Sequence, residues 1–146
     1  MTLLIDANIL LDVLMDRQPF TQSSSLVWKL CETGLVRGYV SVLSFADIVN
    51  IMRKSLSPDK TESLLRSLAQ IFLFADLRFK DLQKAAGMRW GDYEDTVQVT
   101  AAKAVAADYI VTRNLKDYRQ SPVPAILPEQ LCAMFSSENR LLEHIR

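Results

Sequence analysis

Short apolar runs alternate along the chain with longer segments whose apolar residues recur at helical spacing. The apolar runs have the length of buried strands and cover residues 2–6, 38–42, 71–74, 109–111 and 125–126. The helical patterns cover residues 8–16, 21–33, 44–54, 58–70, 77–86, 92–107 and 128–135, with a shorter one at 114–118. Strands that alternate with helices predict an α/β fold, in which a central parallel sheet of four to five strands carries helices on both faces.

Several residues mark where these helices start and stop. Thr21 and Ser44 are predicted to cap the helices that follow them, and Pro58 suits a first helical turn. Gly34 is predicted to end the second helix. The helix at 92–107 is the best defined of the set, because it opens with acidic residues and continues through a run of alanines.

The length and composition fit one ordinary domain. We expect a single domain over residues 1–135 and a polar tail over residues 136–146, since no repeat or low-complexity segment divides the chain. The 17 basic and 17 acidic side chains cancel, which argues against binding of polyanions by a bulk positive field but leaves a local basic patch open. No stretch reaches the roughly 18 apolar residues of a membrane span, and the N-terminus lacks a signal-peptide pattern, so a cytoplasmic protein is expected.

Cysteine and histidine usage excludes several kinds of site. Cys31 and Cys132 lie far apart in apolar surroundings and lack the spacing of a zinc site, so buried free thiols are the simplest interpretation. The sole histidine, His144, falls in the predicted tail. A histidine-based catalytic triad or a zinc centre is therefore not expected.

Acidic residues gather instead at predicted strand ends and helix starts. Asp6 ends the first apolar run, and Asp92, Glu94 and Asp95 open the helix at 92–107. Burying a carboxylate is costly unless it is hydrogen-bonded, paired or bound to a metal. The ordinary alternatives are that Asp6 caps the next helix and that the other acids complement a solvated helix dipole.

A second polar group follows the strand at 109–111. Thr112 can orient a ligand, while Asn114 and Asp117 offer oxygen ligands. Arg113 is a candidate phosphate contact, since arginine binds phosphate in a bidentate manner, and a solvated position in a capped turn is the alternative.

Three further charged residues are weaker candidates. Asp47 lies among apolar residues in the helix at 44–54, and it is either partnered in a site or exposed on the polar face. Arg17 is a second candidate phosphate contact, and Asp12 is either part of a rim or simply exposed.

These acids are expected to meet in one pocket, because functional sites of parallel sheets lie outside the carboxyl ends of the strands. Several carboxylates have little reason to cluster unless a cation lies among them. Oxygen ligands of this kind suit a divalent metal ion, and such a site predicts phosphodiester chemistry.

The motifs together resemble a PIN domain. Asp6-Ala7-Asn8 follows the first strand, Asp92-Tyr93-Glu94-Asp95 opens a helix, and the run from Ile110 to Tyr118 forms a strand and a turn. The stretch at 125–129 resembles the terminal strand and helix of the family. Each motif is weak alone, but their order and spacing make the combination fairly specific over residues 1–135.

The resemblance implies an acidic pocket that binds Mg²⁺ or Mn²⁺ and cleaves single-stranded RNA. VapC-type toxins of toxin–antitoxin pairs are the best-known bacterial group of this family. The motif positions assign metal binding to Asp6, Asp92, Asp95 and Asp117, and catalysis to Asp6, Asp95, Thr112, Asn114 and Asp117. Single-stranded RNA, an antitoxin protein and a second copy of the chain are the candidate partners.

Two positions depart from the pattern of the family. Asp47 stands where many members have Glu, and Asn114 stands where they have Asp, so the site is expected to hold one metal well and a second poorly. These weakened positions favour an alternative function, a non-catalytic module that binds RNA or a partner protein. A third interpretation, a phosphohydrolase with Asp6 as nucleophile, loses support at Asn8, where such enzymes favour a second Asp.

Overall fold

Five parallel strands form one sheet in the described part of the chain. The computed structural model describes residues 1–89 and 91–136. The strands are β1 (Thr2–Ile5), β2 (Arg37–Ser41), β3 (Leu73–Ala75), β4 (Tyr109–Val111) and β5 (Ala125–Ile126). Their order across the sheet is β3-β2-β1-β4-β5. The predicted parallel sheet is confirmed.

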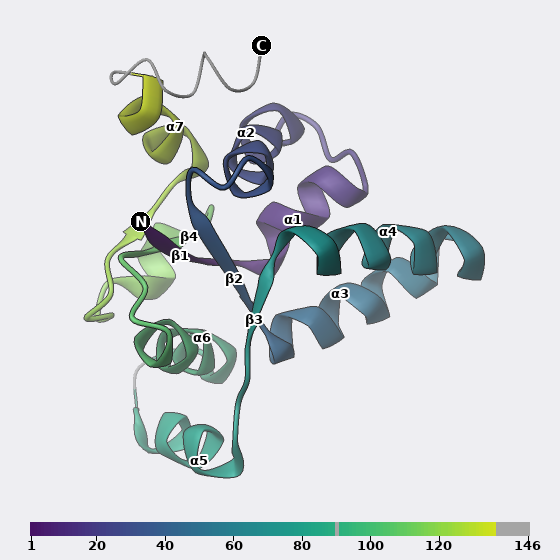
Figure 1. Ribbon diagram of the computed structural model, residues 1–146. Helices are drawn as coiled ribbons and strands as arrows, with labels where there is room; N and C mark the ends of the chain where they lie inside the picture. Colours follow the sequence, from purple (N-terminus) through teal and green to yellow (C-terminus); the bar gives the residue numbers. More distant parts are fainter. Residues whose placement is uncertain (90, 137–146) are drawn as a thin grey trace.

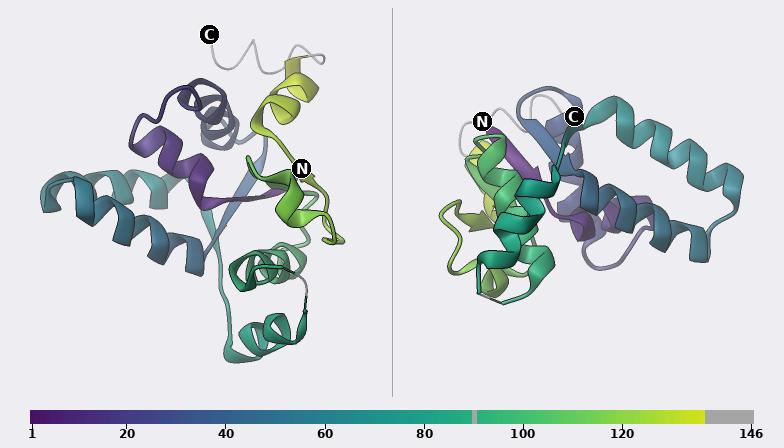
Figure 2. Two further views of the ribbon diagram at one scale, coloured as in Figure 1. Left: turned by 180° about the vertical axis from the view of Figure 1, so that it is seen from behind. Right: turned by 90° about the horizontal axis from the view of Figure 1, so that it is seen from below.

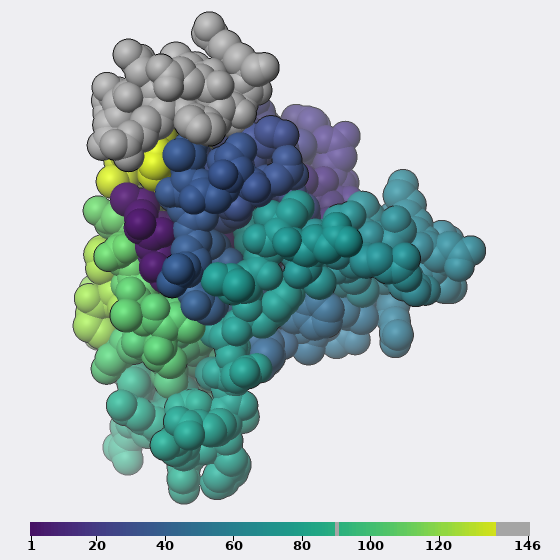
Figure 3. Space-filling view, viewed as in Figure 1, coloured from purple at the N-terminus to yellow at the C-terminus, as the bar shows by residue number. Residues whose placement is uncertain are grey.

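Helices cover both faces of this sheet (Figures 1 and 2). They are α1 (Ala7–Leu14), α2 (Thr21–Glu32), α3 (Val42–Ser55), α4 (Pro58–Ile71), α5 (Phe79–Gly87), α6 (Tyr93–Ala104), α7 (Pro128–Ser136) and the 3-10 helix η1 (Leu115–Tyr118). Helices α1, α2 and α7 lie on one side, and α6 with α5 outside it lies on the other (Figure 1). Helices α3 and α4 pack together as a hairpin that projects from the body of the molecule (Figure 3).

The sheet separates two hydrophobic clusters. Leu3 and Ile5 of β1 point into the cluster shared with α1, α2, α3, α4 and α7, whereas Leu4 points into the cluster shared with α6. All three side chains are fully buried. Each such side chain stabilises the fold by roughly 1.5–3 kcal/mol, so β1 is anchored from both faces and the residue that follows it is held firmly.

A glycine allows β2 to approach the helix layer. A methyl group on Gly38 would lie 2.6 Å from Cys31 Sγ and 3.1 Å from Phe72 Cδ1. Cys31 and Cys132 are both free and buried, as the sequence predicted. Gly34, with φ +81°, ends α2 in the left-handed conformation that glycine adopts readily.

Several predicted boundaries are wrong for local reasons. Thr21 does not cap α2, because the helix begins at Thr21 itself and Phe20 takes the N-cap position without a side-chain hydrogen bond. Ser41, not Ser44, caps α3, because Ser41 Oγ accepts the Ser44 backbone N–H at 3.1 Å. Helix α4 runs on through Ile71, so β3 begins at Leu73 rather than at residue 71. Helix α6 ends at Ala104, and Ala106 adopts a positive φ of 54° as the chain turns toward β4.

Some expectations fall outside the described residues. The predicted tail, including His144, lies there apart from Ser136, which ends α7. Over residues 1–89 and 91–136, none of the helices is both long enough and apolar enough to cross a membrane.

Candidate active site

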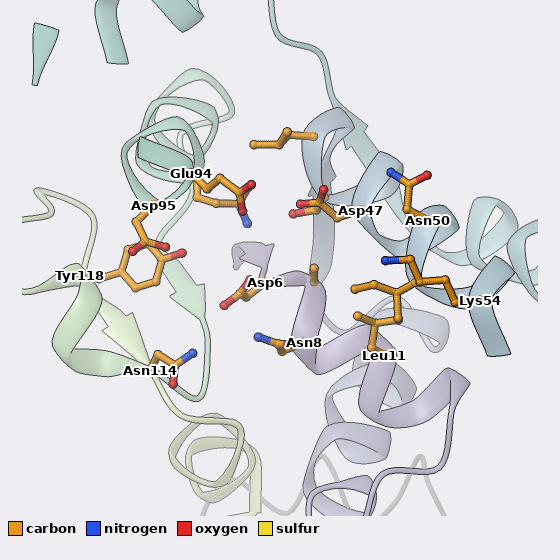
Figure 4. A pocket seen from close by; sticks show the side chains of 15 residues that line it. Asp6, Asn8, Leu11, Asp47, Asn50, Lys54, Glu94, Asp95, Asn114 and Tyr118 are labelled. Carbon is orange, nitrogen blue, oxygen red and sulfur yellow. The ribbon is translucent and has the colours of Figure 1, made fainter. Parts of the chain in front are cut away.

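The acidic cluster lies at the carboxyl ends of β1 and β4. These two strands are neighbours at the point where the strand order reverses, which is where parallel α/β sheets bind ligands. A cavity of about 490 Å³ opens there. Asp6, Asp47, Glu94, Asp95 and Asn114 line its wall together with Tyr118, Gln98 and Lys54 (Figure 4). Segments that are distant in sequence therefore supply the carboxylates of one cavity, as predicted.

Asp6 is held at the junction of the two strands. Its backbone N–H donates to the Val111 carbonyl at 3.0 Å, and its Oδ2 accepts a hydrogen bond from Thr112 Oγ1 at 2.9 Å. Asp6 is also the N-cap residue of α1, as the alternative interpretation expected, although its side chain does not reach the amides deeper in the first turn. Burial raises the pKa of Asp6, and the hydrogen bond from Thr112 opposes this shift. A hydrogen bond with the Ala7 amide also helps to keep its pKa down. The pocket thus holds a carboxylate that gains from a positive partner.

Asp95 faces Asp6 from the first turn of α6. Burial and the negative charges of Asp92, Asp117 and Asp6 raise the pKa of Asp95 to about 6. A hydrogen bond from the Tyr118 hydroxyl opposes that rise. Burial also raises the pKa of Tyr118, so its hydroxyl stays protonated and remains a donor to Asp95.

Asp47 and Glu94 approach each other across the mouth of the cavity (Figure 4). The charge of Asp47 is the main cause that raises the pKa of Glu94, with burial and Asp92 adding to it. Asp47 therefore lies at the site rather than on an uninvolved polar face. Glu94 belongs to the predicted acidic motif but was not among the predicted ligands.

A second cavity of about 440 Å³ lies on the other side of Asp95. Its wall combines Asp92, Asp95 and Asp117 with the basic side chains of Arg89, Lys116 and Arg119. Asp92 is also the N-cap of α6 and accepts hydrogen bonds from the amides of Glu94 at 2.7 Å and Asp95 at 3.3 Å. Asp92 and Asp117 are thus placed beside the first cavity rather than in it, and Asp95 is common to both.

Both predicted phosphate contacts, Arg113 and Arg17, have hydrogen-bond partners within the fold. Arg113 forms a bidentate ion pair with Asp12, at 3.0 Å from Nε to Oδ2 and 3.1 Å from Nη2 to Oδ1. Its guanidinium also lies 3.8 Å from the ring centroid of Phe20. The expectation that Asp12 is exposed is wrong, because this residue is fully buried and also accepts a hydrogen bond from Ser24 Oγ at 2.9 Å. Arg17 Nη1 lies 3.4 Å from Asn8 Oδ1.

Thr112 and Asn114 differ in their placement. Thr112 is fully buried behind Asp6, and its Oγ1 also accepts the Asn114 backbone N–H at 3.1 Å. Asn114 is exposed and lines the first cavity, where its amide oxygen is available as a ligand.

The donor set fits a hard divalent cation. Within residues 1–89 and 91–136, no three acidic, histidine or cysteine side chains lie close enough together to enclose an ion by themselves. Mg²⁺ commonly binds proteins through one or two carboxylates and completes its shell with water and substrate phosphate. Asp6 and Asp95, both with a raised pKa, match that pattern.

The sequence interpretation missed Tyr118 and Gln98. Gln98 follows Asp95 by three residues and Glu94 by four, so helical periodicity alone places all three on one face of α6. Tyr118 was assigned only to a short helix, and its contact with Asp95 depends on how η1 packs against α6.

The fold resembles several solved structures. A chain of the VapBC2 complex from Rickettsia felis, bound to a promoter DNA fragment, has a TM-score of 0.66 at 18% identity, over 87% of this chain and 98% of that chain. A chain of a toxin–antitoxin complex from Klebsiella pneumoniae has a TM-score of 0.65 at 18% identity, over 86% and 96%. VapC20 from Mycobacterium tuberculosis, described as a toxin that cleaves the sarcin–ricin loop, has a TM-score of 0.60 at 6% identity, over 74% and 86%. At these identities the likeness establishes the fold alone.

The sequence itself gives the family. No curated protein matches the chain. The PIN domain family model matches residues 2–116, a range that contains Asp6, Asp47, Asp95 and Asn114. Because this match covers most of the chain, the protein belongs to the PIN domain family.

Proposed function

We propose that the protein is a metal-dependent endoribonuclease that hydrolyses phosphodiester bonds of single-stranded RNA. The observation that carries this proposal is the convergence of Asp6 and Asp95 on one cavity, where burial raises both pKa values and neighbouring carboxylates add to each rise. Such carboxylates gain free energy from a divalent cation, and perturbed carboxylates in a cleft are typical of functional sites.

The residues around the cavity have separable roles. Asp6 and Asp95 hold Mg²⁺ or Mn²⁺, with Asn114 or Asp117 as a further oxygen ligand and Glu94 and Asp47 on the opposite wall. The metal supplies an activated water and neutralises charge on the scissile phosphate. Thr112 keeps the Asp6 carboxylate oriented through its hydroxyl, and Tyr118 does the same for Asp95.

The adjoining cavity offers the positive charge that an RNA strand requires. Arg89, Lys116 and Arg119 line it, and none of them forms an ion pair with another described residue. We assign these three side chains, rather than the paired Arg113, to the phosphates that flank the scissile bond. This local basic group accounts for how a chain with no net charge receives a polyanion. Arg17 remains a candidate at the rim near Asn8.

The fold also supports a place in a toxin–antitoxin pair. Its similarity to chains of toxin–antitoxin complexes favours an antitoxin protein as partner, acting in the cytoplasm. Induced expression in a bacterial host should then arrest growth, and an Asp95→Asn variant should not. Equal growth of both strains would contradict the toxin assignment while leaving the nuclease assignment open. Sedimentation across the micromolar range tests whether two copies associate.

The nuclease assignment is tested by RNA cleavage in Mn²⁺. Asp95→Asn should lose activity, and Asp59→Asn should retain it, because Asp59 is an exposed acid in the first turn of α4. Anomalous scattering from a crystal soaked in Mn²⁺ should give a peak beside the Asp6 and Asp95 oxygens. Cleavage that survives Asp95→Asn would contradict the assignment. Equal RNA binding with and without chelator, without cleavage, would support a non-catalytic binding module instead.

A further inference from the structure

Gln98 places an amide at the back of the acidic cavity. It lies on α6, one helical turn beyond Glu94 and Asp95, and lines the same cavity as these acids. Only 4% of its surface is exposed. A buried polar side chain normally has all of its hydrogen-bonding groups satisfied, so the partners of both ends of this amide are informative.

One end of the amide is fixed by the end of β2. Ser41 Oγ donates to Gln98 Oε1 at 2.6 Å and accepts the backbone N–H of Ser44 at 3.1 Å. Because the Ser41 hydroxyl is itself held by its capping role in α3, it fixes the direction of the Gln98 carbonyl oxygen. The opposite end of the amide, Nε2, is thereby left to other acceptors.

Gln98 Nε2 has no acceptor among the described residues. Glu94 precedes it by four residues, the spacing at which side chains on a helix meet, yet no hydrogen bond joins them. A buried donor without a partner lowers stability. Gln98 lines the cavity although Nε2 itself is enclosed, so a bound group reaches this donor only when the side chains around it turn aside.

We propose that Gln98 Nε2 donates a hydrogen bond to a phosphate oxygen of the bound RNA strand. This inference rests on the proposed function and names a contact within it. The ligand must be an acceptor at this point, because the atom without a partner, Gln98 Nε2, is a donor.

A neutral donor suits this position. The cavity wall already carries four carboxylates and Lys54. A cation at the back of the cavity would compete with a metal for those carboxylates, whereas an amide N–H contacts an anionic oxygen without changing the charge of the site. Hydrogen bonds to charged groups are the stronger class, so this single contact is expected to affect RNA affinity measurably.

The test uses two variants and a matched control. Gln98→Met keeps the length of the side chain without a donor, and Gln98→Glu keeps its shape but turns a carboxylate toward the phosphate. Gln83→Met makes the same change as the first variant at an exposed position on α5. Binding of a fluorescent single-stranded RNA is measured in Ca²⁺, cleavage in Mn²⁺, and the melting temperature with and without Mn²⁺.

Gln98→Met should weaken RNA binding about ten-fold or more, and Gln98→Glu should weaken it further, while Gln83→Met leaves it unchanged. The Mn²⁺-induced rise in melting temperature should persist in Gln98→Met. RNA with phosphorothioate linkages gives a further measurement, which would be unaffected if Gln98 had only a structural role. Sulfur is a weak acceptor, so one diastereomer should bind the wild type more weakly and lose that difference in Gln98→Met.

The outcomes that would contradict the Gln98 contact differ from those that would contradict the proposed nuclease activity. Wild-type RNA affinity in Gln98→Met would overturn the contact. The contact would also be overturned if Gln98→Met lost both RNA binding and the Mn²⁺-induced rise in melting temperature, because Gln98 would then act through the metal ligands. If Gln98→Met fails to fold, unchanged RNA affinity in Gln98→Glu overturns the contact in the same way. RNA binding without cleavage by the wild type would contradict the proposed nuclease but leave the contact supported. No RNA binding by the wild type would overturn both.

Discussion

Thr112 donates its hydroxyl hydrogen to Asp6 across 2.9 Å, from Oγ1 to Oδ2, and so ties together the carboxyl ends of two neighbouring strands. The two residues are 106 positions apart in sequence. The same hydroxyl accepts the Asn114 backbone N–H, which fixes its donor direction toward Asp6. The orientation of the first acid of the site therefore depends on a buried side chain of the neighbouring strand.

Replacement of Thr112 by valine is expected to weaken metal binding. The change keeps the shape but removes the donor to Asp6 and the acceptor for Asn114, and loss of such a supporting partner typically costs roughly 10–100-fold in metal affinity or activity. Stability should fall by about 1–3 kcal/mol, because both partners lose their hydrogen bond. Mn²⁺ titration and chemical denaturation measure the two effects. Thr112→Ser retains the hydroxyl and should behave like the wild type. A valine variant with wild-type Mn²⁺ affinity would show that Thr112 does not position Asp6.

Stability without a metal should depend on pH in an unusual direction. Folding raises the pKa of Asp95 from 3.8 to about 6. Between these values the folded state binds the proton more tightly than the unfolded state, so the free energy of unfolding falls as pH rises. Burial of Asp6 and the charge of Asp47 next to Glu94 shift those two pKa values in the same direction. The melting temperature in chelator should therefore be higher near pH 5 than near pH 7.

Two comparisons isolate the cause of this pH effect. Asp95→Asn should reduce the difference between pH 5 and pH 7, because the substituted amide does not titrate. Mn²⁺ at pH 7 should raise the melting temperature of the wild type, since the cation offsets the repulsion among the carboxylates. A wild-type melting temperature that rises steadily from pH 5 to pH 7 in chelator would contradict the argument.

Local patterns were enough to predict the fold and to bring several of the candidate residues together. Alternating strands and helices indicated the parallel sheet, and the carboxyl-end rule brought Asp6, Asp95 and Asn114 to one cavity. The cap of α3 was misplaced by three residues, because Ser41 and Ser44 are both good caps and only the backbone geometry of the turn distinguishes them.

The partners of buried polar groups were not predictable in the same way. Arg113 pairs with Asp12 across 101 residues, and Gln98 pairs with Ser41 across 57. No periodicity links such positions, because each pair depends on how whole elements pack. Arg113 was for this reason assigned to phosphate from its side-chain chemistry, while its guanidinium is occupied inside the fold.

The Asp12–Arg113 pair should matter for stability more than for RNA binding. Arg113→Met leaves the fully buried Asp12 carboxylate without its cation, and breaking a buried pair from one side costs about 3–5 kcal/mol. Adding Asp12→Leu to that variant removes the unpaired charge and should recover much of the loss. Urea denaturation of the single and double variants measures both steps. A stable Arg113→Met protein with weakened RNA affinity would instead restore Arg113 as a phosphate contact.

The basic side chains of the second cavity should set the salt dependence of RNA binding. Lys116 lies in η1 and Arg119 is the residue that follows this helix, and both line the second cavity, which shares Asp95 with the first. Lys116→Glu and Arg119→Glu should each weaken binding of single-stranded RNA. Removing one cation from the phosphates should reduce the slope of log affinity against log salt by about 0.7. Both side chains are exposed, so stability should change little.

Lys60→Glu, on the exposed side of α4, is the matched control for these two variants and should leave the slope unchanged. Equal slopes for all three variants and the wild type would show that the strand does not cross Asp95 into the second cavity. The RNA phosphates would then have to contact Lys54 or Arg17 instead, on the side of the first cavity formed by α3 and α1.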